Sequence, residues 1–215
     1  MAELGDHRSI CCRDVHRPLA LGVDSEYDLL RLLDTAEMPP LWSKTIQAQK
    51  TLIALPGNAP ATLLANYRKL AEALRQGRKG PTEIKLDSDI TDLPADSGIL
   101  LLGWENTWRE RMSDALGGYD GGVSENSARI GKDNYLRSKN SVLFSGRHPS
   151  SAELAITWVA SDNPKSFAGL IEQLPQYGQY SYLAFEGDEA KNIAKGTWEG
   201  ARQTFKVLPA SKATS

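Results

Sequence analysis

The chain has 215 residues and a mass of 23.6 kDa, enough to bury a core without a metal ion or a disulfide, and it fits one main domain. Its charged content of 24% and net charge of −2 give no electrostatic reason to bind nucleic acid or anionic lipid. No stretch approaches the roughly 20 apolar residues that span a bilayer. We therefore expect a soluble protein that binds neither nucleic acid nor anionic lipid.

The first fifty residues read as an irregular lead-in to a folded domain. They hold no apolar run after a basic start, so no signal peptide is predicted. The compartment stays open: we expect a cytoplasmic chain as it stands, or an exported one if it is a fragment of a longer secreted hydrolase. Cys11 and Cys12 are adjacent and would bridge only through a strained ring, so we expect no disulfide. Leucine spacing predicts a short amphipathic helix over 25–33, and a helical turn follows over 42–49.

Three apolar, β-prone runs each end in a cluster of Gly, Asn, Asp or Pro that opens a segment of helical period. The strands are expected at 51–55, 99–102 and 155–160, and the helices that follow them begin near residues 61, 107 and 164. This repetition predicts an α/β fold, a Rossmann-like and mostly parallel sheet with helices on both faces.

The remaining segments predict shorter elements. A strand over 82–86 precedes a loop with four aspartates, Asp87, Asp89, Asp92 and Asp96, which we interpret as solvated because it lacks the glycine and terminal glutamate of a calcium loop. Residues 117–127 read as a long connection, or alternatively as a mobile loop near a site. Further expectations are strands over 129–135 and 141–145 joined as a hairpin, a strand over 182–185, a short helix over 189–197 and a polar tail.

These elements predict three regions: an N-terminal linker or lead-in over 1–49, the α/β domain over 50–208, and a disordered tail over 209–215.

The residues before the expected helices predict which side chains cap the helix N-termini. Thr107 and Glu110 fit a capping box. Asn163 followed by Pro164 fits an N-cap with proline at the first helical position. Asn58, Asn106 and Asn163 are interpreted as helix caps, with contact to an anion as the alternative.

Catalytic and cofactor motifs do not emerge from the sequence. Neither GxGxxG nor GxxxxGK[ST] follows a strand, so no nucleotide cofactor is expected. Ser145 and His148 are close in sequence, but no nucleophile elbow surrounds them. His7, His16 and His148 are isolated, and HExxH is missing, so we expect no metal site and assign no catalytic residue.

A ligand site, if present, is expected at the carboxyl ends of the parallel strands, where open α/β sheets bind their ligands. Of the residues there, Arg147 and His148 are the best candidates for contact with an anion; the alternative is a surface turn set by Pro149. The candidate ligand-binding residues are Asn58, Trp104, Glu105, Asn106, Arg147, His148 and Asp162.

Three segments of the second half carry a resemblance to a known family: Ser141–Pro149, Ile156–Val159, and Leu174–Gly187 followed by Asn192–Trp198. They resemble the Rossmann-like C-terminal accessory module of bacterial zinc metallopeptidases of the aminopeptidase N (gluzincin) type and of related large hydrolases. The resemblance covers roughly residues 50 to 200.

The resemblance implies an accessory domain that is covalently linked to a hydrolase or associates with one. The HExxH helix and its downstream glutamate have no counterpart here, so no functional residue is carried over. Two hypotheses follow: a non-catalytic accessory or interaction module, and a small ligand-binding or hydrolytic α/β domain with its site at the strand ends. The ligand, the partner and the oligomeric state stay open.

Overall fold

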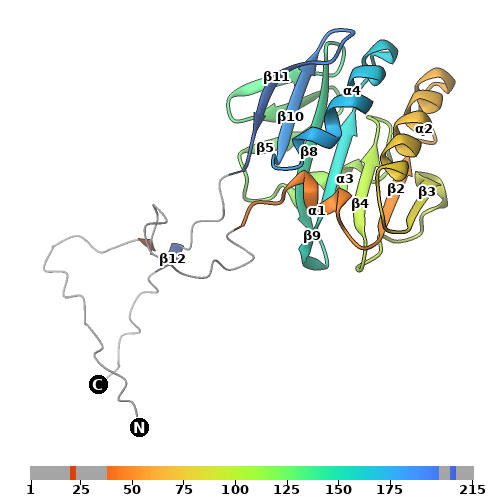
Figure 1. The fold of residues 1–215 in the computed structure, drawn as a ribbon. Helices are drawn as coiled ribbons and strands as arrows, with labels where there is room; N and C mark the ends of the chain where they lie inside the picture. The colour runs from red at the N-terminus through yellow and green to blue at the C-terminus, as the bar shows by residue number, and fades with distance from the viewer. Residues whose placement is uncertain (1–19, 23–37, 199–203, 207–215) are drawn as a thin grey trace, which may run out of the picture. The chain divides into compact units, whose positions relative to one another are not determined.

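The computed structural model describes residues 20–22, 38–198 and 204–206 (Figure 1). The chain divides into two compact units, one formed by Met1–Arg31 with Arg202–Ser215 and the other by Leu32–Ala201. In the first unit, β1 (Ala20–Gly22) pairs with β12 (Thr204–Lys206) in antiparallel fashion. The expected helix over 25–33, both cysteines and the expected tail lie outside the described residues.

A seven-stranded sheet organises the second unit in the order β11-β10-β8-β9-β4-β2-β3. The strands are β2 (Thr51–Leu55), β3 (Thr82–Leu86), β4 (Gly98–Leu102), β8 (Asn140–His148), β9 (Ser151–Ala160), β10 (Tyr182–Glu186) and β11 (Lys191–Gly196). β3, β2, β4 and β9 are mutually parallel, whereas β8, β10 and β11 pair in antiparallel fashion. Since β10 is antiparallel to β8, it points the same way as β9, so five of the seven strands share one direction. The predicted α/β class with a mostly parallel sheet is confirmed.

The central strands are buried on both faces, which their continuous apolar sequences require. Alternate residues of each strand contribute to two separate cores: Ile53 and Leu100 belong to one, Leu52 and Ile99 to the other. This two-sided burial explains why the runs at 51–55 and 99–102 could be recognised as strands from composition alone.

Three helices cover one face of the sheet: α1 (Trp42–Ile46), α2 (Ala61–Gln76) and α4 (Phe167–Gln173) (Figure 1). Short 3₁₀ segments, η2 (Pro164–Ser166) and η3 (Leu174–Tyr177), flank α4. The helix expected near residue 61 is confirmed as α2, and its buried face consists of Leu63, Tyr67, Leu70, Ala71 and Leu74.

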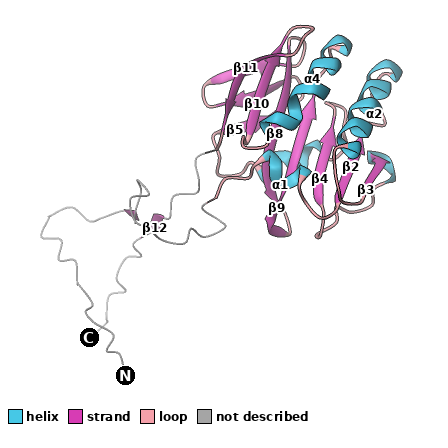
Figure 2. Cartoon of the chain, in the orientation of Figure 1, coloured by secondary structure: helices cyan, strands magenta, loops and turns pink. Residues whose placement is uncertain are grey.

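The opposite face is covered by α3 (Arg109–Ala115) and by a separate three-stranded sheet. That sheet consists of β5 (Gly121–Val123), β6 (Ser127–Ile130) and β7 (Asp133–Leu136). The expected single strand over 129–135 is wrong: Gly131, with φ +59°, turns the chain between β6 and β7. The expected connection over 117–127 likewise contains a strand, β5. Figure 2 separates the helices from these strands by colour.

The predicted helix over 189–197 is also wrong, because this segment is β11 at the edge of the sheet. Its glutamate, alanines and lysines have good helix propensity, which explains the error. Pairing with β10 overrides that propensity, and the hairpin between the two strands turns through Gly187 at φ +77° and Ala190 at φ +51°.

The expected lead-in contributes to the core of the larger unit. Trp42 is completely buried, and its indole Nε1 donates a hydrogen bond to the Leu174 carbonyl at 3.0 Å. Thr45 is buried as well, and its hydroxyl bonds to the Ala155 carbonyl at 3.0 Å and to the Thr157 hydroxyl at 2.8 Å. α1 is therefore fixed to β9 although it precedes residue 50.

Candidate functional site

The carboxyl ends of the parallel strands bring together most of the predicted site residues. Asn58 follows β2, while Trp104, Glu105 and Asn106 follow β4, and Asp162 follows β9. The chain leaving β4 continues to α3 on one face, and the chain leaving β9 continues to α4 on the other. Such a divergence is a topological switch point, the usual ligand position in open α/β sheets.

Gly103 shapes the start of the β4 loop. Its φ of +91° lies in the left-handed region, and an added Cβ would lie 2.6 Å from Pro56 Cγ. Its carbonyl accepts a hydrogen bond from Trp158 Nε1 at 2.9 Å, and its N–H donates to the Val159 carbonyl at 2.9 Å. The loop that carries Trp104, Glu105 and Asn106 is thus fixed to β9 at its first residue.

Asn106 is 3% exposed, and its side chain bonds to the backbone. Its Nδ2 donates to the carbonyls of Ala54 and Leu102, each at 3.0 Å, and its Oδ1 accepts from the Trp108 N–H at 3.0 Å. These bonds tie the ends of β2 and β4 together just before α3. The predicted capping box is wrong, because α3 has Trp108 at its N-cap and no side-chain cap bond.

Asp87, which follows β3, also uses its side chain to hold backbone segments together. It is 2% exposed; its Oδ1 accepts from the N–H groups of Gly57 (2.8 Å) and Ser88 (2.9 Å), and its Oδ2 accepts from the Thr107 N–H (2.8 Å). For Asp87 the prediction of a solvated acidic loop is therefore wrong. The carboxylate joins the loops after β2, β3 and β4, beside a cavity of about 490 Å³ that Thr107 and Trp108 also line.

Arg137 joins the two strand ends at the switch point. Its Nη2 bonds to Glu105 Oε1 and its Nε to Asp162 Oδ2, while the guanidinium carbon lies 5.7 Å from the centre of the Trp104 ring. Burial opposes the charge of Arg137, but its bonds to Asp162 and Glu105 outweigh that effect and raise its pKa. The side chains of Arg137, Glu105 and Asp162 are 22%, 19% and 29% exposed.

Sequence reasoning missed Arg137, since it lies in the polar segment between β7 and β8 with no motif around it. Two oxygens of this cluster keep unused acceptor capacity: Glu105 Oε2 and Asp162 Oδ1 are buried and have no hydrogen-bond partner. Both oxygens are therefore open to a further donor.

A buried hydroxyl network surrounds Ser161, the residue before Asp162, and no motif in the sequence indicates it. The Tyr67 hydroxyl accepts from the Ser161 N–H and donates to the Ser161 carbonyl, both at 2.8 Å. Ser161 Oγ also bonds to the hydroxyls of Ser141 (2.8 Å) and Ser166 (2.9 Å). Burial raises the pKa of Tyr67, so this phenol stays neutral and structural.

The three asparagines differ in use. Asn163 is the N-cap of η2, as predicted: its Oδ1 accepts from the Lys165 N–H at 3.1 Å. Asn58 is exposed, and α2 begins after Pro60 with no side-chain cap, so the cap interpretation is wrong for Asn58.

Replacing Asn163 with alanine should lower the free energy of unfolding by about 1 kcal/mol, because the cap acceptor is lost. Urea unfolding measures this effect, and serine at position 163 should restore most of the stability. Asn58→Ala is the matched control and should leave the midpoint unchanged. An Asn163→Ala protein as stable as the parent would contradict the cap.

Arg147 and His148 lie at the other end of the sheet. β8 runs antiparallel to β9, and His148 pairs with Ser151 at the start of β9, whereas Val142 pairs with Ala160 at its end. The expected grouping of these two residues with Asn58, Glu105 and Asp162 is therefore wrong. The antiparallel hairpin β8–β9 was not foreseen, because strand direction is not encoded in either strand's own pattern.

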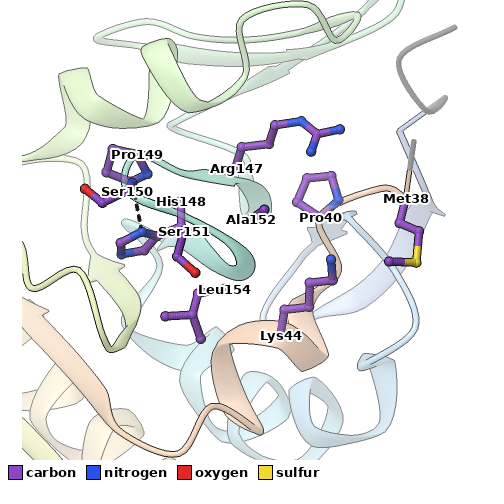
Figure 3. Close-up of a pocket in the computed structure, with 10 residues that line it drawn as sticks. All are labelled: Met38, Pro40, Lys44, Arg147, His148, Pro149, Ser150, Ser151, Ala152 and Leu154. Carbon is purple, nitrogen blue, oxygen red and sulfur yellow. Dashed lines mark hydrogen bonds between the residues drawn. The ribbon is translucent and has the colours of Figure 1, made fainter. Parts of the chain in front are cut away.

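His148 holds the turn of this hairpin. Its Nδ1 accepts from the Ser150 N–H at 3.1 Å (Figure 3). Its Nε2 contacts the Pro94 carbonyl at 3.1 Å. Since a carbonyl can only accept, Nε2 carries the proton and the ring is neutral. Burial lowers the pKa of His148, in agreement with that state.

Within the described residues, no group of three or more His, Cys, Asp or Glu side chains is placed to hold a metal ion. The helices among those residues include none long and apolar enough to cross a membrane. A scan against protein-family models and a search of curated proteins find no match to this chain.

Proposed function

We propose that the chain is a non-catalytic accessory or interaction domain of a peptidase-like hydrolase, built on a Rossmann-like α/β domain. The observation that carries the proposal is Arg137: the chain's own guanidinium occupies the switch point between β4 and β9, where an α/β enzyme would hold its substrate. Glu105 and Asp162, the carboxylates best placed for acid–base chemistry, are paired with it.

Two further residues support this proposal. Asp87 and Asn106 direct their polar atoms at backbone groups of the surrounding loops. Polar side chains used in this way hold strand ends together and are not available to a reacting group. The resemblance to the accessory module of aminopeptidase N-type enzymes supplies the class of partner, a hydrolase domain covalently linked to this domain or bound to it.

A peptidase assay on the purified chain tests the non-catalytic part of the proposal. We expect the chain and its Glu105→Gln and Asp162→Asn variants to give the same background rate on a panel of fluorogenic aminoacyl and peptidyl substrates. Turnover by the parent chain that either variant abolishes would contradict the proposal.

The alternative is a small ligand-binding or hydrolytic domain with its site at the same strand ends. The buried, unpartnered oxygens Glu105 Oε2 and Asp162 Oδ1 favour it, because a ligand with N–H donors would satisfy them. Chemical shift changes at Glu105 and Asp162 on titration with methylguanidine would support this alternative.

A further inference from the structure

The cavity of about 490 Å³ beside Asp87 lies at the carboxyl ends of β3 and β4. Three segments form its walls: the 3₁₀ turn η1 (Asp87–Asp89) with the residue after it, the loop after β4, and α3. Its volume falls within the usual range for small-molecule sites, and it lies at the edge where open α/β sheets bind their ligands.

One wall of this cavity is apolar and fixed in place. Trp108 is half-buried; its Nε1 donates to the Asp87 carbonyl at 3.2 Å, and its backbone N–H donates to Asn106 Oδ1 at 3.0 Å. Ile90, which is 9% exposed, packs with the core on this face of the sheet. The cavity therefore has a preformed aromatic and aliphatic surface.

The rest of the lining carries more negative than positive charge. Asp87, Glu110 and Asp114 supply three carboxylates, and among the lining residues Arg111 supplies the one guanidinium, which leaves a net charge of −2. Asp87 is bonded by three backbone N–H groups, which are neutral, so its charge is stabilised without being cancelled by a cation.

Glu110, Arg111 and Asp114 are exposed and share one face of α3, since residues three and four apart are neighbours on a helix. In the described part of the chain, neither carboxylate forms a hydrogen bond or an ion pair, and Arg111 pairs with neither. One guanidinium beside two carboxylates reduces the negative potential of this wall and does not reverse it.

The start of α3 does not offer a competing site for an anion. The N–H groups of Thr107, Trp108, Arg109 and Arg111 already donate to acceptors of the chain at 2.8 to 3.0 Å. An anion entering this cavity would meet occupied donors and three carboxylates. Charge and hydrogen bonding therefore both favour a cation.

We infer that this cavity binds a small organic cation, an apolar body that carries one protonated amine. Glu110 and Asp114 bind the ammonium group, while the Trp108 ring and Ile90 contact the apolar body. Asp87 makes no direct contact, because both of its oxygens are engaged in holding the loops. This inference goes beyond the proposed function and does not depend on it.

The test is an NMR titration of the full chain with phenethylamine and with 2-phenylethanol, which keeps the ring and lacks the positive charge. We expect the amine to bind at millimolar concentrations and the alcohol to bind about tenfold more weakly, because the attraction to the two carboxylates is lost. 3-Phenylpropionate should bind more weakly still. Undetectable binding of the amine, or equal binding of all three compounds, would overturn the inference.

A further arm identifies the source of the amine. Nα-acetyl-lysine methylamide carries the ammonium on a peptide unit. If it binds more tightly than phenethylamine, the ligand is a basic side chain of a peptide; if it binds more weakly, the ligand is a free amine. Either result supports the site, because the ammonium is common to both probes.

The indole N–H signal of Trp108 places the ligand in the cavity. This signal, identified by its loss in Trp108→Phe, should shift on titration with phenethylamine. The indole signal of Trp42, which belongs to the core on the opposite face of the sheet, should not shift. Shifts at Glu105 and Asp162 without a shift at Trp108 would assign the amine to the strand-end carboxylates and overturn the inference.

Charge variants give the site a distinctive signature. Glu110→Gln and Asp114→Asn should each weaken amine binding about threefold, and together about tenfold. Arg111→Gln should tighten it about threefold, because the competing positive charge is removed. Glu172→Gln removes an exposed carboxylate from α4, and it is the matched control with unchanged affinity.

These variants keep the inference falsifiable, because the side chains that they change are exposed. Each should shift the melting temperature by less than about 2 °C. A folded Glu110→Gln/Asp114→Asn chain that binds phenethylamine as tightly as the parent would overturn the inference. Association with a hydrolase is tested separately in cell extracts, so either proposal can fail without the other.

Discussion

Replacing Arg137 with methionine is expected to lower the free energy of unfolding by about 3 kcal/mol, because the change leaves Glu105 and Asp162 largely buried without their cation. Methionine keeps much of the apolar stem, so the loss reports the charge and its bonds. Urea denaturation followed by far-UV circular dichroism measures it.

Two comparisons isolate the cause. Arg129→Met breaks the exposed pair of Arg129 with Asp120, and it should cost less than about 1 kcal/mol. Adding Glu105→Gln and Asp162→Asn to Arg137→Met should recover much of the lost stability, because no unpaired charge is left at the strand ends. If Arg137→Met and Arg129→Met prove equally mild, Arg137 does not hold the strand ends together.

Replacing Trp42 with alanine should cost about 4 kcal/mol, the range for emptying a large buried aromatic site. Trp42 is fully buried, packs in the core with α2 and α4, and donates its indole N–H to the Leu174 carbonyl. The change therefore creates a cavity and leaves a buried acceptor without its donor. Thermal unfolding and urea unfolding both measure the loss.

A matched control lies four residues away. Met38 is 36% exposed, so Met38→Ala should change stability by less than about 0.5 kcal/mol. Near-native stability of Trp42→Ala would contradict the placement of α1 in the core of the larger unit.

The parts of the fold that depend on local pattern were predictable from sequence. Thr51–Leu55 and Thr82–Leu86 match the expected strands residue for residue. The first is a continuous apolar run, and in the second Ile84 and Leu86 alternate with polar residues; both patterns leave few alternatives. The Asn163–Pro164 helix start was also predictable, since both residues act on their immediate neighbours.

Elements that depend on distant partners were not predictable in this way. Segment Lys191–Gly196 has a helical composition, and only pairing with β10 makes it a strand. Gly131 divides the expected strand over 129–135 into β6 and β7, and the resulting sheet packs on the second core. Tertiary contacts therefore decided segment Lys191–Gly196 against its local preference, whereas the turn at Gly131 is a local one that the expected strand over 129–135 passed over.

The same distinction applies to the candidate site. Chain order places Glu105 and Asp162 after adjacent parallel strands, so their proximity follows from the topology. The role of Arg137 does not follow from it, since this residue reaches Glu105 and Asp162 across 32 and 25 residues of sequence from a segment without a motif. Arg147 was predicted at the wrong end of the sheet, because β8 runs antiparallel to its neighbour β9. The sequence of β8 does not encode that direction; the β8–β9 hairpin sets it.

The central claim, an accessory domain of a peptidase-like hydrolase, is tested most directly by the native size of the gene product in its source cells. Extracts would be fractionated by size-exclusion chromatography, immunoblotted with an antibody to this chain, and assayed for peptidase activity in each fraction. We predict that the antibody signal elutes at an apparent mass far larger than that of the purified 23.6 kDa chain. It should coincide with peptidase activity that the same antibody depletes. Elution at the position of the purified chain, apart from any peptidase activity, would contradict the account.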